Sequence, residues 1–255
     1  MLETGLAPTT PVDDNLLRRF LHNQAELTVT LAESRGGVVL REPGVIAGWY
    51  DSPVFYNNMA VLTSPLTPES WKAVDTLYEG RWATLLSAWP TEDLSDHGWS
   101  LMGHPMLVVR SPGHLATTAA PGVTTEVACT AEDLALGEQL AAEGYPLEAL
   151  VGAPANSVYA ESTLESPLLV RIGRVDGEPV SVAASYLAHD VVNLCLAATL
   201  DAARRKGVWA QLVADRVNDE EHLPACAITS DDSRPGFVKM GFLPVQRMTM
   251  WLHPA

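Results

Sequence analysis

The sequence has 255 residues, of which 47% are hydrophobic, so it can bury the core of one large domain or of two small ones. Acidic residues outnumber basic ones by 31 to 16, which gives a formal net charge of -15. This charge repels nucleic acids and anionic membranes, and no stretch approaches the roughly 18 apolar residues of a membrane span.

The first third of the chain shows a helical pattern followed by strand patterns. Asp13 or Asp14 is suited to cap a helix whose apolar residues recur at helical spacing as far as Leu27. Three apolar runs follow, with a Pro-Gly turn between the first two, which predicts a small antiparallel meander. These runs span residues 38–40, 45–47 and 54–62.

The remainder of the first half predicts a second helix and two more strands. Thr67 is placed to cap a helix that has Pro68 in its first turn and Gly80 just past its end. Strands at 83–89 and 105–109 flank a short helix at 91–96. Small and turn-forming residues at 110–122 then form a connection, so we predict two domains, residues 1–118 and 119–255.

The second half repeats this order of elements. Thr130 and Asp133 have capping-box spacing at the start of a helix, and Gly144 is a stop signal. Asp176-Gly177 is the dipeptide favoured in a tight hairpin turn. The predicted strands of this half span 168–175, 179–188, 191–199, 225–229 and 245–252, with helices after the third and the fourth.

The ends of the two halves also match each other without a gap. Residues 98–102 align with 241–245, and 104–109 with 247–252, at an offset of 143 residues. We interpret the chain as two similar halves. The alternative is an unrelated N-terminal α/β domain.

Three consecutive cations precede the helix that follows residues 191–199. Arg204, Arg205 and Lys206 are followed by Gly207, which lets a backbone approach closely. The unpaired N–H groups at a helix start favour an anion. The spacing matches neither a Walker loop nor a Rossmann fingerprint. We therefore predict a phosphate-bearing ligand here, against the alternative of a solvated basic cluster.

These residues carry a resemblance to a known superfamily. Thr199 to Leu212 resembles motif A of the Gcn5-related N-acetyltransferase (GNAT) superfamily, and residues 236–242 resemble the end of its motif B. The resemblance covers residues 123–255 and implies an α/β fold with a mixed sheet, the acyl-CoA N-acyltransferase fold, with the two halves as GNAT-like units. It implies transfer of an acetyl group from acetyl-CoA to a primary amine of a small acceptor, without a metal.

The resemblance also implies roles for individual residues. The strand at 191–199 would bind the pantetheine arm, the cationic loop and helix start would hold the pyrophosphate, and the last helix would complete the cofactor site. The cofactor residues are Ala197, Ala198, Thr199, Arg204, Arg205, Lys206, Gly207, Val208, Trp209, Ala210, Asp232, Ser233 and Phe237. The Ala198 backbone N–H is the expected oxyanion donor, and Asn193 lies where histone-type members carry a glutamate.

Two departures from the family pattern and an unassigned base leave the chemistry open. Trp209 replaces a small residue, Phe237 replaces a tyrosine that protonates the leaving thiolate, and the amide of Asn193 cannot accept a proton. We assign no general base. The alternative function is a non-catalytic acyl-CoA-binding sensor or partner module. A third reading, an aminoacyl-transferase with two such halves, fits poorly because transfer RNA is an anion.

The first half lacks the cofactor loop, since residues 64–69 contain no glycine or cation and Glu69 would repel a phosphate. We interpret it as a degenerate copy that helps to shape the acceptor cleft. The acidic chain suits an amine-bearing acceptor, and a homodimer is a further expectation.

The N-terminus and the cysteines indicate the compartment. The first residues lack the basic and apolar regions of a signal peptide, which predicts a cytoplasmic protein. Cys129, Cys195 and Cys226 lie in apolar, strand-like surroundings without paired spacing, so we expect three buried free thiols.

Overall fold

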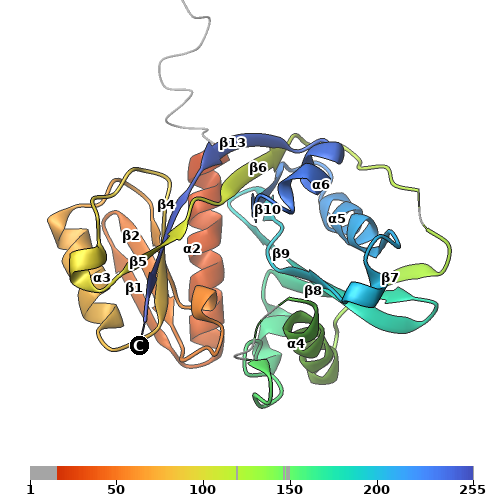
Figure 1. Ribbon diagram of the computed structural model, residues 1–255, viewed down its shortest axis with the longest axis horizontal. Helices are drawn as coiled ribbons and strands as arrows, with labels where there is room; N and C mark the ends of the chain where they lie inside the picture. Colours follow the sequence, from red (N-terminus) through yellow and green to blue (C-terminus); the bar gives the residue numbers. More distant parts are fainter. Residues whose placement is uncertain (1–15, 119, 146, 148–149, 255) are drawn as a thin grey trace, which may run out of the picture.

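A computed structural model describes residues 16–118, 120–145, 147 and 150–254. The predicted helix start at Asp13 or Asp14 lies outside these residues. Two mixed sheets stand side by side, with the long helix α2 (Leu16–Ser34) between them (Figure 1). Within the described part of the chain, no helix is long and apolar enough to cross a membrane.

The first sheet has the strand order β1-β2-β3-β4-β14-β5. Its strands are β1 (Val38–Glu42), β2 (Val45–Trp49), β3 (Met59–Leu62), β4 (Ala83–Ser87), β14 (Thr249–His253) and β5 (Ser100–Gly103). Helix α3 (Pro68–Tyr78) packs on one face against buried side chains such as Ala47 and Leu85. Helix α2 covers the opposite face through Phe20 and Leu21, which pack with Val61 and other residues of that face. The alternation of side chains along each strand thus produces two core layers.

The second sheet has the strand order β13-β6-β12-β10-β9-β8-β7, and β11 pairs with β9 beside this path. Its strands are β13 (Leu243–Arg247), β6 (Met106–Arg110), β12 (Ala225–Thr229), β10 (Val191–Asn193), β9 (Glu178–Ala188), β8 (Leu168–Val175), β7 (Val123–Val127) and β11 (Ala197–Thr199). Helix α4 (Ala131–Gly144) packs on one face, whereas α5 (Val208–Asn218) and α6 (Arg234–Lys239) pack on the other.

Helix α2 belongs to the cores of both sheets. Besides covering the first sheet, it places the buried Asn23 at the turn between β9 and β10. The side-chain Nδ2 of Asn23 lies 2.9 to 3.1 Å from the carbonyl oxygens of Tyr186, Ala188 and Val191. Because a buried amide needs such partners, this residue fixes the second sheet against the helix of the first half.

The prediction of one closing strand at 245–252 is wrong, because the chain crosses there from one sheet to the other. Strand β13 pairs with β6 in the second sheet, whereas β14 lies between β4 and β5 in the first. At the crossing, Met248 is fully buried and its N–H donates to the Pro105 carbonyl at 2.8 Å.

The first half makes the reciprocal crossing. Its last strand, β6, lies between β12 and β13 of the second sheet. Strands β6 (106–110) and β14 (249–253) are offset by 143 residues at both ends, the offset found between the matching segments of the sequence. Each sheet therefore contains one strand from the other half, and the sheets do not divide at residue 118. Duplication of the halves stays a prediction.

Several elements were predicted correctly from local signals. Thr67 and Thr130 form capping boxes at the starts of α3 and α4. Asp176 and Gly177 both adopt positive φ, 53° and 88°, in the hairpin turn between β8 and β9. The predicted fold class, a mixed α/β arrangement, is confirmed.

Other expectations were wrong or incomplete. The predicted helix at 91–96 is only the 3-10 turn η2 (Ser95–His97), and strands β5 and β7 were not predicted. Of the three thiols, Cys226 is buried, Cys195 is partly exposed, and Cys129 is exposed. The strand β7 ends at Val127, so Cys129 lies in the exposed link to α4 instead of within a strand.

Candidate functional site

The predicted strand at 191–199 is interrupted, and the interruption opens the second sheet. Strand β10 pairs with β12 in parallel through Val192 and Asn193, and the Leu194 N–H still donates to the Cys226 carbonyl at 2.7 Å. Leu196 then has a φ of 35°, a conformation that few non-glycine residues adopt. Beyond it, β11 pairs with β9 alone, which leaves its other edge without a strand partner among the described residues.

The hydrogen-bond pattern of β11 corrects the predicted oxyanion donor. The Leu200 N–H donates to Val180, and Leu196 accepts from the Ala184 N–H, at 2.9 and 3.1 Å. In an antiparallel pair, every second residue bonds to the neighbouring strand. The Ala198 backbone between these two residues therefore also faces β9, and its N–H is used in the sheet. Ala197 and Thr199 direct their backbone groups to the open edge, where the Arg204 Nε donates to the Thr199 carbonyl at 3.4 Å.

A buried arginine on α5 braces the interruption. The Nη1 of Arg216 donates to the carbonyls of Ala184 and Cys195, at 2.7 and 3.3 Å, and its Nε donates to Leu212 at 2.9 Å. Its Nη2 has no hydrogen-bond partner among the described residues. Burial lowers the pKa of Arg216 to about 10, so the guanidinium is still charged at neutral pH. Arg216 was not among the predicted site residues.

The start of α5 offers free backbone donors. Gly207 caps the helix with a φ of 87° and provides no side-chain acceptor. No described residue accepts a hydrogen bond from the N–H groups of Val208, Trp209 or Ala210. In α3 and α4, by contrast, the capping side chain accepts from an amide of the first turn. An uncapped helix start of this kind is suited to bind an anion.

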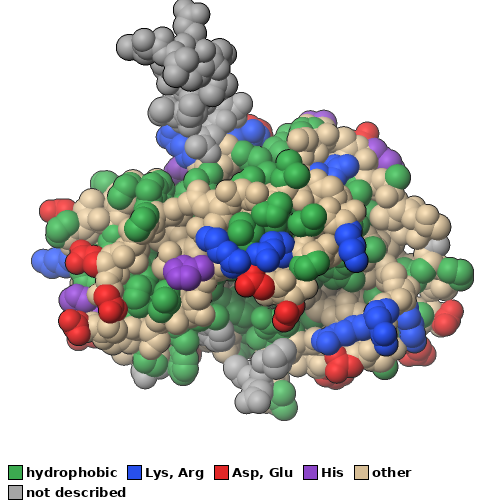
Figure 2. All heavy atoms as spheres, turned by 45° about the horizontal axis from the view of Figure 1, so that its top comes forward, with side chains coloured by type: hydrophobic (Ala, Val, Ile, Leu, Met, Phe, Trp, Pro, Cys, Tyr) green, Lys and Arg blue, Asp and Glu red, His purple; other side chains and the backbone are tan. Residues whose placement is uncertain are grey.

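Two of the three predicted cations are available near these amides. Arg204 forms an ion pair with Asp201 at 2.9 Å and also donates to the Gly144 carbonyl at 3.3 Å, so it is occupied within the fold. Arg205 and Lys206 are exposed. Figure 2 shows one group of basic side chains at the lower right of the molecule, among others at the centre and the upper left.

The indole of Trp209 lies against α6. Its ring meets the Phe237 ring edge to face, with centroids 5.1 Å apart and planes at 89°. A Cβ atom at Gly236 would lie 2.9 Å from the indole, which shows how closely the two helices pack. Phe237 makes a second edge-to-face contact with Phe242. These contacts fix the indole against α6. The ring therefore packs away from the free N–H groups at the start of α5.

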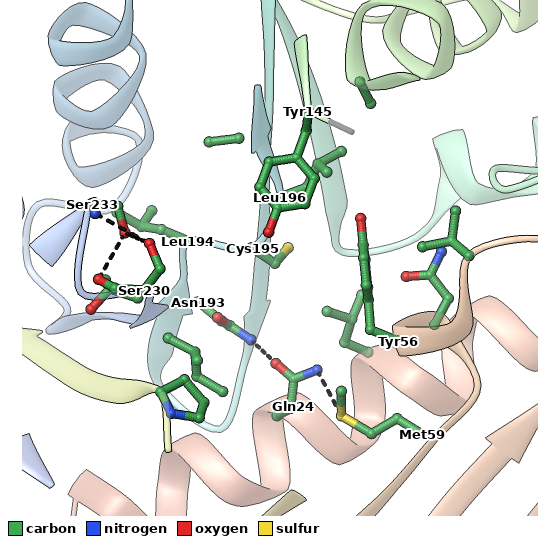
Figure 3. A pocket seen from close by; sticks show the side chains of 18 of the residues that line it. Gln24, Tyr56, Met59, Tyr145, Asn193, Leu194, Cys195, Leu196, Ser230 and Ser233 are labelled. Carbon is green, nitrogen blue, oxygen red and sulfur yellow. Dashed lines mark hydrogen bonds between the residues drawn. The ribbon is translucent and has the colours of Figure 1, made fainter. Parts of the chain in front are cut away.

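A cavity of about 600 Å³ continues from α6 to the space between the two sheets. Trp209, Ser233 and Phe237 line it on the α6 side, and residues 193–197 cross its middle. Figure 2 shows a recess with hydrophobic side chains between the two halves, and Figure 3 shows the interior. The far end is bounded by α2, α4 and the segment at 54–59.

Asn193 and Gln24 join the two halves across this cavity (Figure 3). The Asn193 Nδ2 donates to Gln24 Oε1 at 2.8 Å, and Gln24 Nε2 lies 3.7 Å from the Met59 sulfur. Gln24 comes from α2 and is 169 residues away from Asn193 in the sequence. Local patterns carry no signal for such a contact, which is why Asn193 was predicted as a site residue and Gln24 was not.

The predicted site residues separate into those that share the cavity and those that do not. Asn193, Ala197, Trp209, Ser233 and Phe237 line it together. The loop 204–207 and Ala210 lie at the α5 start instead, and Asp232 is exposed outside the cavity lining. The described residues contain no group of three or more His, Cys, Asp or Glu side chains placed to hold a metal ion.

Solved structures resemble the chain over nearly its whole length. A GCN5-related N-acetyltransferase from Kribbella flavida matches with a TM-score of 0.67 and 22% identity, covering 95% of this chain and 97% of its own. A putative acetyltransferase of the GNAT family from Novosphingobium aromaticivorans matches at 0.63 and 14%, covering 95% and 100%. The chain has the GNAT fold. No protein-family model matches the sequence, and no curated protein matches it significantly.

The GNAT fold of this chain therefore includes both sheets, not only residues 123–255. A conserved protein of unknown function from Staphylococcus epidermidis also matches, with a TM-score of 0.58 and 11% identity over 86% of this chain and 94% of its own. The fold predicted from the two sequence motifs is confirmed. Fold alone does not fix an activity, which must be argued from the site.

Proposed function

We propose that the protein transfers an acetyl group from acetyl-CoA to a primary amine. One observation carries the proposal: β11, which has an open edge, contacts α5, whose start is uncapped. This arrangement offers backbone partners for an extended amide-bearing arm and free N–H groups for its diphosphate. Acetyl-CoA contains both parts and would supply the activated acyl group.

Each part of the site has residues suited to the cosubstrate. The amides of Val208, Trp209 and Ala210, with the charges of Arg205 and Lys206, would hold the diphosphate. The backbone of Ala197 and Thr199 would pair with the pantetheine arm. On the α6 side, Ser233 and Phe237 line the same cavity and would contact the arm near its reactive end.

The first half has no equivalent site among its described residues. Strand β3 pairs with β4 along Met59, Ala60 and Val61, so no edge opens between them. Thr67 caps α3, and Glu69 in its first turn would repel a phosphate. We propose that the first half is a degenerate copy which closes the acceptor side of the cavity.

The cavity offers no free carboxylate, among its described residues, to act as a general base for the attacking amine. Glu138 lines the cavity, but its carboxylate accepts three backbone N–H groups, those of Ser157, Val158 and Tyr159 at 2.8 to 3.1 Å. An apolar site lowers the pKa of a bound amine, because burial disfavours its charged form. The neutral amine nitrogen would then bond to the acyl carbon as the carbon–sulfur bond breaks, and the proton lost from nitrogen would leave on the thiol.

A second candidate function is supported by one position. Phe237 cannot protonate a departing thiolate, and its ring packs between Trp209 and Phe242. A site that binds acyl-CoA without turnover would serve as a sensor or partner module.

Calorimetric titration with coenzyme A and acetyl-CoA tests binding, and thiol release over a panel of amines tests transfer. We expect both ligands to bind and acetyl-CoA to release thiol with at least one amine. Binding without release across the panel would favour the sensor. No binding of either ligand would refute the whole proposal.

A further inference from the structure

The far end of the cavity, which we call the acceptor chamber, is lined mainly by apolar and aromatic side chains, with Gln24, Thr28 and Asn57 as polar members of the lining. Leu27 and Leu31 enter it from α2, Ala141 from α4, and Val158 and Tyr159 from the segment that precedes η4 (Glu161–Glu165). Figure 3 shows Tyr56 and Tyr145 on two sides of the space beside Cys195. The chamber is thus suited to an apolar or aromatic body.

The chamber has no carboxylate to pair with a cation. Among the described residues that line the cavity, only Glu138 and Asp231 are acidic. Glu138 already accepts three backbone N–H groups. Asp231 pairs with Arg234 and Arg247, at 2.7 and 2.9 Å, on the α6 side of the cavity.

The other ionisable groups considered in this part of the cavity are positively charged or neutral. Arg216 is charged at neutral pH and lines the same cavity. Burial raises the pKa of Tyr159 well above its usual range and that of the Cys195 thiol to about 11, so both groups stay neutral. A permanently cationic group in the chamber would lose water and gain no counter-charge. The excess of acidic residues behind the net charge of -15 therefore lies outside the acceptor chamber.

One polar atom is placed to orient an amine. The Asn193 Nδ2 is engaged by Gln24, which leaves Oδ1 as the unused side of the amide. No described residue donates to this oxygen, and Asn193 lines the cavity beside Cys195 and the open edge of β11. An amide oxygen accepts hydrogen bonds from N–H groups. It can therefore hold an amino group at the junction between the acceptor chamber and the sheet opening.

We propose that the acceptor is a primary monoamine with an aromatic or branched aliphatic body, bound in the acceptor chamber with its nitrogen on Asn193 Oδ1. This inference rests on the proposed acetyl transfer and adds the class of acceptor. Polyamines fit poorly, because each brings further cationic groups to a chamber without a free counter-charge, and an amino sugar brings several hydroxyl groups to walls that are mainly apolar. Burial of the single amino group favours its neutral, nucleophilic form.

The first experiment compares acceptors. Thiol release from acetyl-CoA is measured with 2-phenylethylamine and isoamylamine, and with spermidine and glucosamine. The two monoamines should give kcat/KM values at least tenfold above those of the other amines. Binding of 2-phenylethylamine to protein saturated with coenzyme A is measured by calorimetry as well, so that slow turnover does not hide recognition.

The second experiment alters the chamber without touching the cofactor residues. Ala141 is buried on α4 and lines the chamber, whereas Gln139 is exposed on the same helix. Ala141→Phe should fill the chamber and raise KM for 2-phenylethylamine at least tenfold, with the Kd of coenzyme A changed by less than twofold. Gln139→Phe is the matched control and should change neither. If Ala141→Phe does not fold, Leu31→Ala serves instead and should shift preference toward bulkier monoamines.

Separate results would overturn separate claims. If coenzyme A and acetyl-CoA do not bind, the proposed function fails. If they bind, but spermidine or glucosamine is acetylated as well as the monoamines, the acceptor class is wrong while acetyl transfer stands. The same conclusion follows if no monoamine either binds or reacts, or if Ala141→Phe folds and leaves KM unchanged.

Discussion

Replacement of Arg216 by methionine tests whether a buried cation braces the interrupted strand. The Ala184 carbonyl would lose its bond from Nη1, which is 2.7 Å long in the native fold. An unsatisfied buried carbonyl costs about 1–3 kcal/mol. The weaker bond to Cys195, at 3.3 Å, would also be lost. The variant also removes a buried charge whose Nη2 is unpaired, which offsets part of the lost stability. We therefore expect the free energy of unfolding to fall by about 2 kcal/mol.

Urea unfolding measures this loss directly. With a urea m-value of about 3 kcal/mol/M for a chain of this size, the midpoint of Arg216→Met should fall by about 0.7 M. Arg41→Met is the control, because Arg41 makes an exposed ion pair with Glu26 at 2.8 Å, and such pairs contribute less than about 1 kcal/mol. An unchanged or higher midpoint for Arg216→Met would refute the bracing role, since buried charges are in some proteins replaced by apolar groups without loss.

The remaining predictions concern the anion site, the indole and pH. Arg205→Glu combined with Lys206→Glu should weaken coenzyme A binding by about 2 kcal/mol, or about 30-fold in Kd, and the effect should be smaller at high salt. Lys206→Glu alone should raise the Kd more than the control Lys72→Glu on α3. Equal Kd values for these two variants would contradict the assigned loop. Trp209→Ala should lower the free energy of unfolding by about 2 kcal/mol through lost packing on α6, yet change the Kd of coenzyme A by less than threefold; a larger change would mean that the indole contacts the ligand. Burial, then electrostatic interaction with His189 and Arg18, lowers the pKa of His22 below 6.5. The contribution of the neutral imidazole to stability is therefore complete above pH 6.5 and is lost as the pH falls through the folded-state pKa. Urea midpoints between pH 7 and about pH 5 should therefore fall less for His22→Gln than for the native chain, and parallel curves would contradict this assignment.

Features encoded by neighbouring residues were predictable from the sequence. The caps at Thr67 and Thr130 and the turn at Asp176-Gly177 need only a few adjacent side chains, and the structure confirms them. The start of α5 was also found from local signals, namely three cations and Gly207 before an apolar helical face. The motif resemblance then identified the fold.

Features that depend on distant pairing were not predictable in this way. The run from Val191 to Thr199 is apolar except for Asn193 and Thr199, and it contains no glycine or proline to mark the point where the pairing with β12 ends. Arg216 lies on the apolar face of α5, but its partners Ala184 and Cys195 come from other strands. The contact of Gln24 with Asn193 joins residues 169 positions apart. Such contacts follow from topology, which a periodic pattern does not contain.

The reciprocal placement of β6 and β14 has a consequence for biosynthesis. A ribosome makes the first half before residues 249–253 exist, so β4 and β5 must wait with unpaired edges until β14 fills the space between them. At the same stage, β12 and β13, the strands that pair with β6 in the second sheet, have not been synthesised. Exposed edges of this kind invite aggregation and chaperone binding. Both sheets can therefore be completed only after the last strands have been synthesised, and neither half can finish folding before the other.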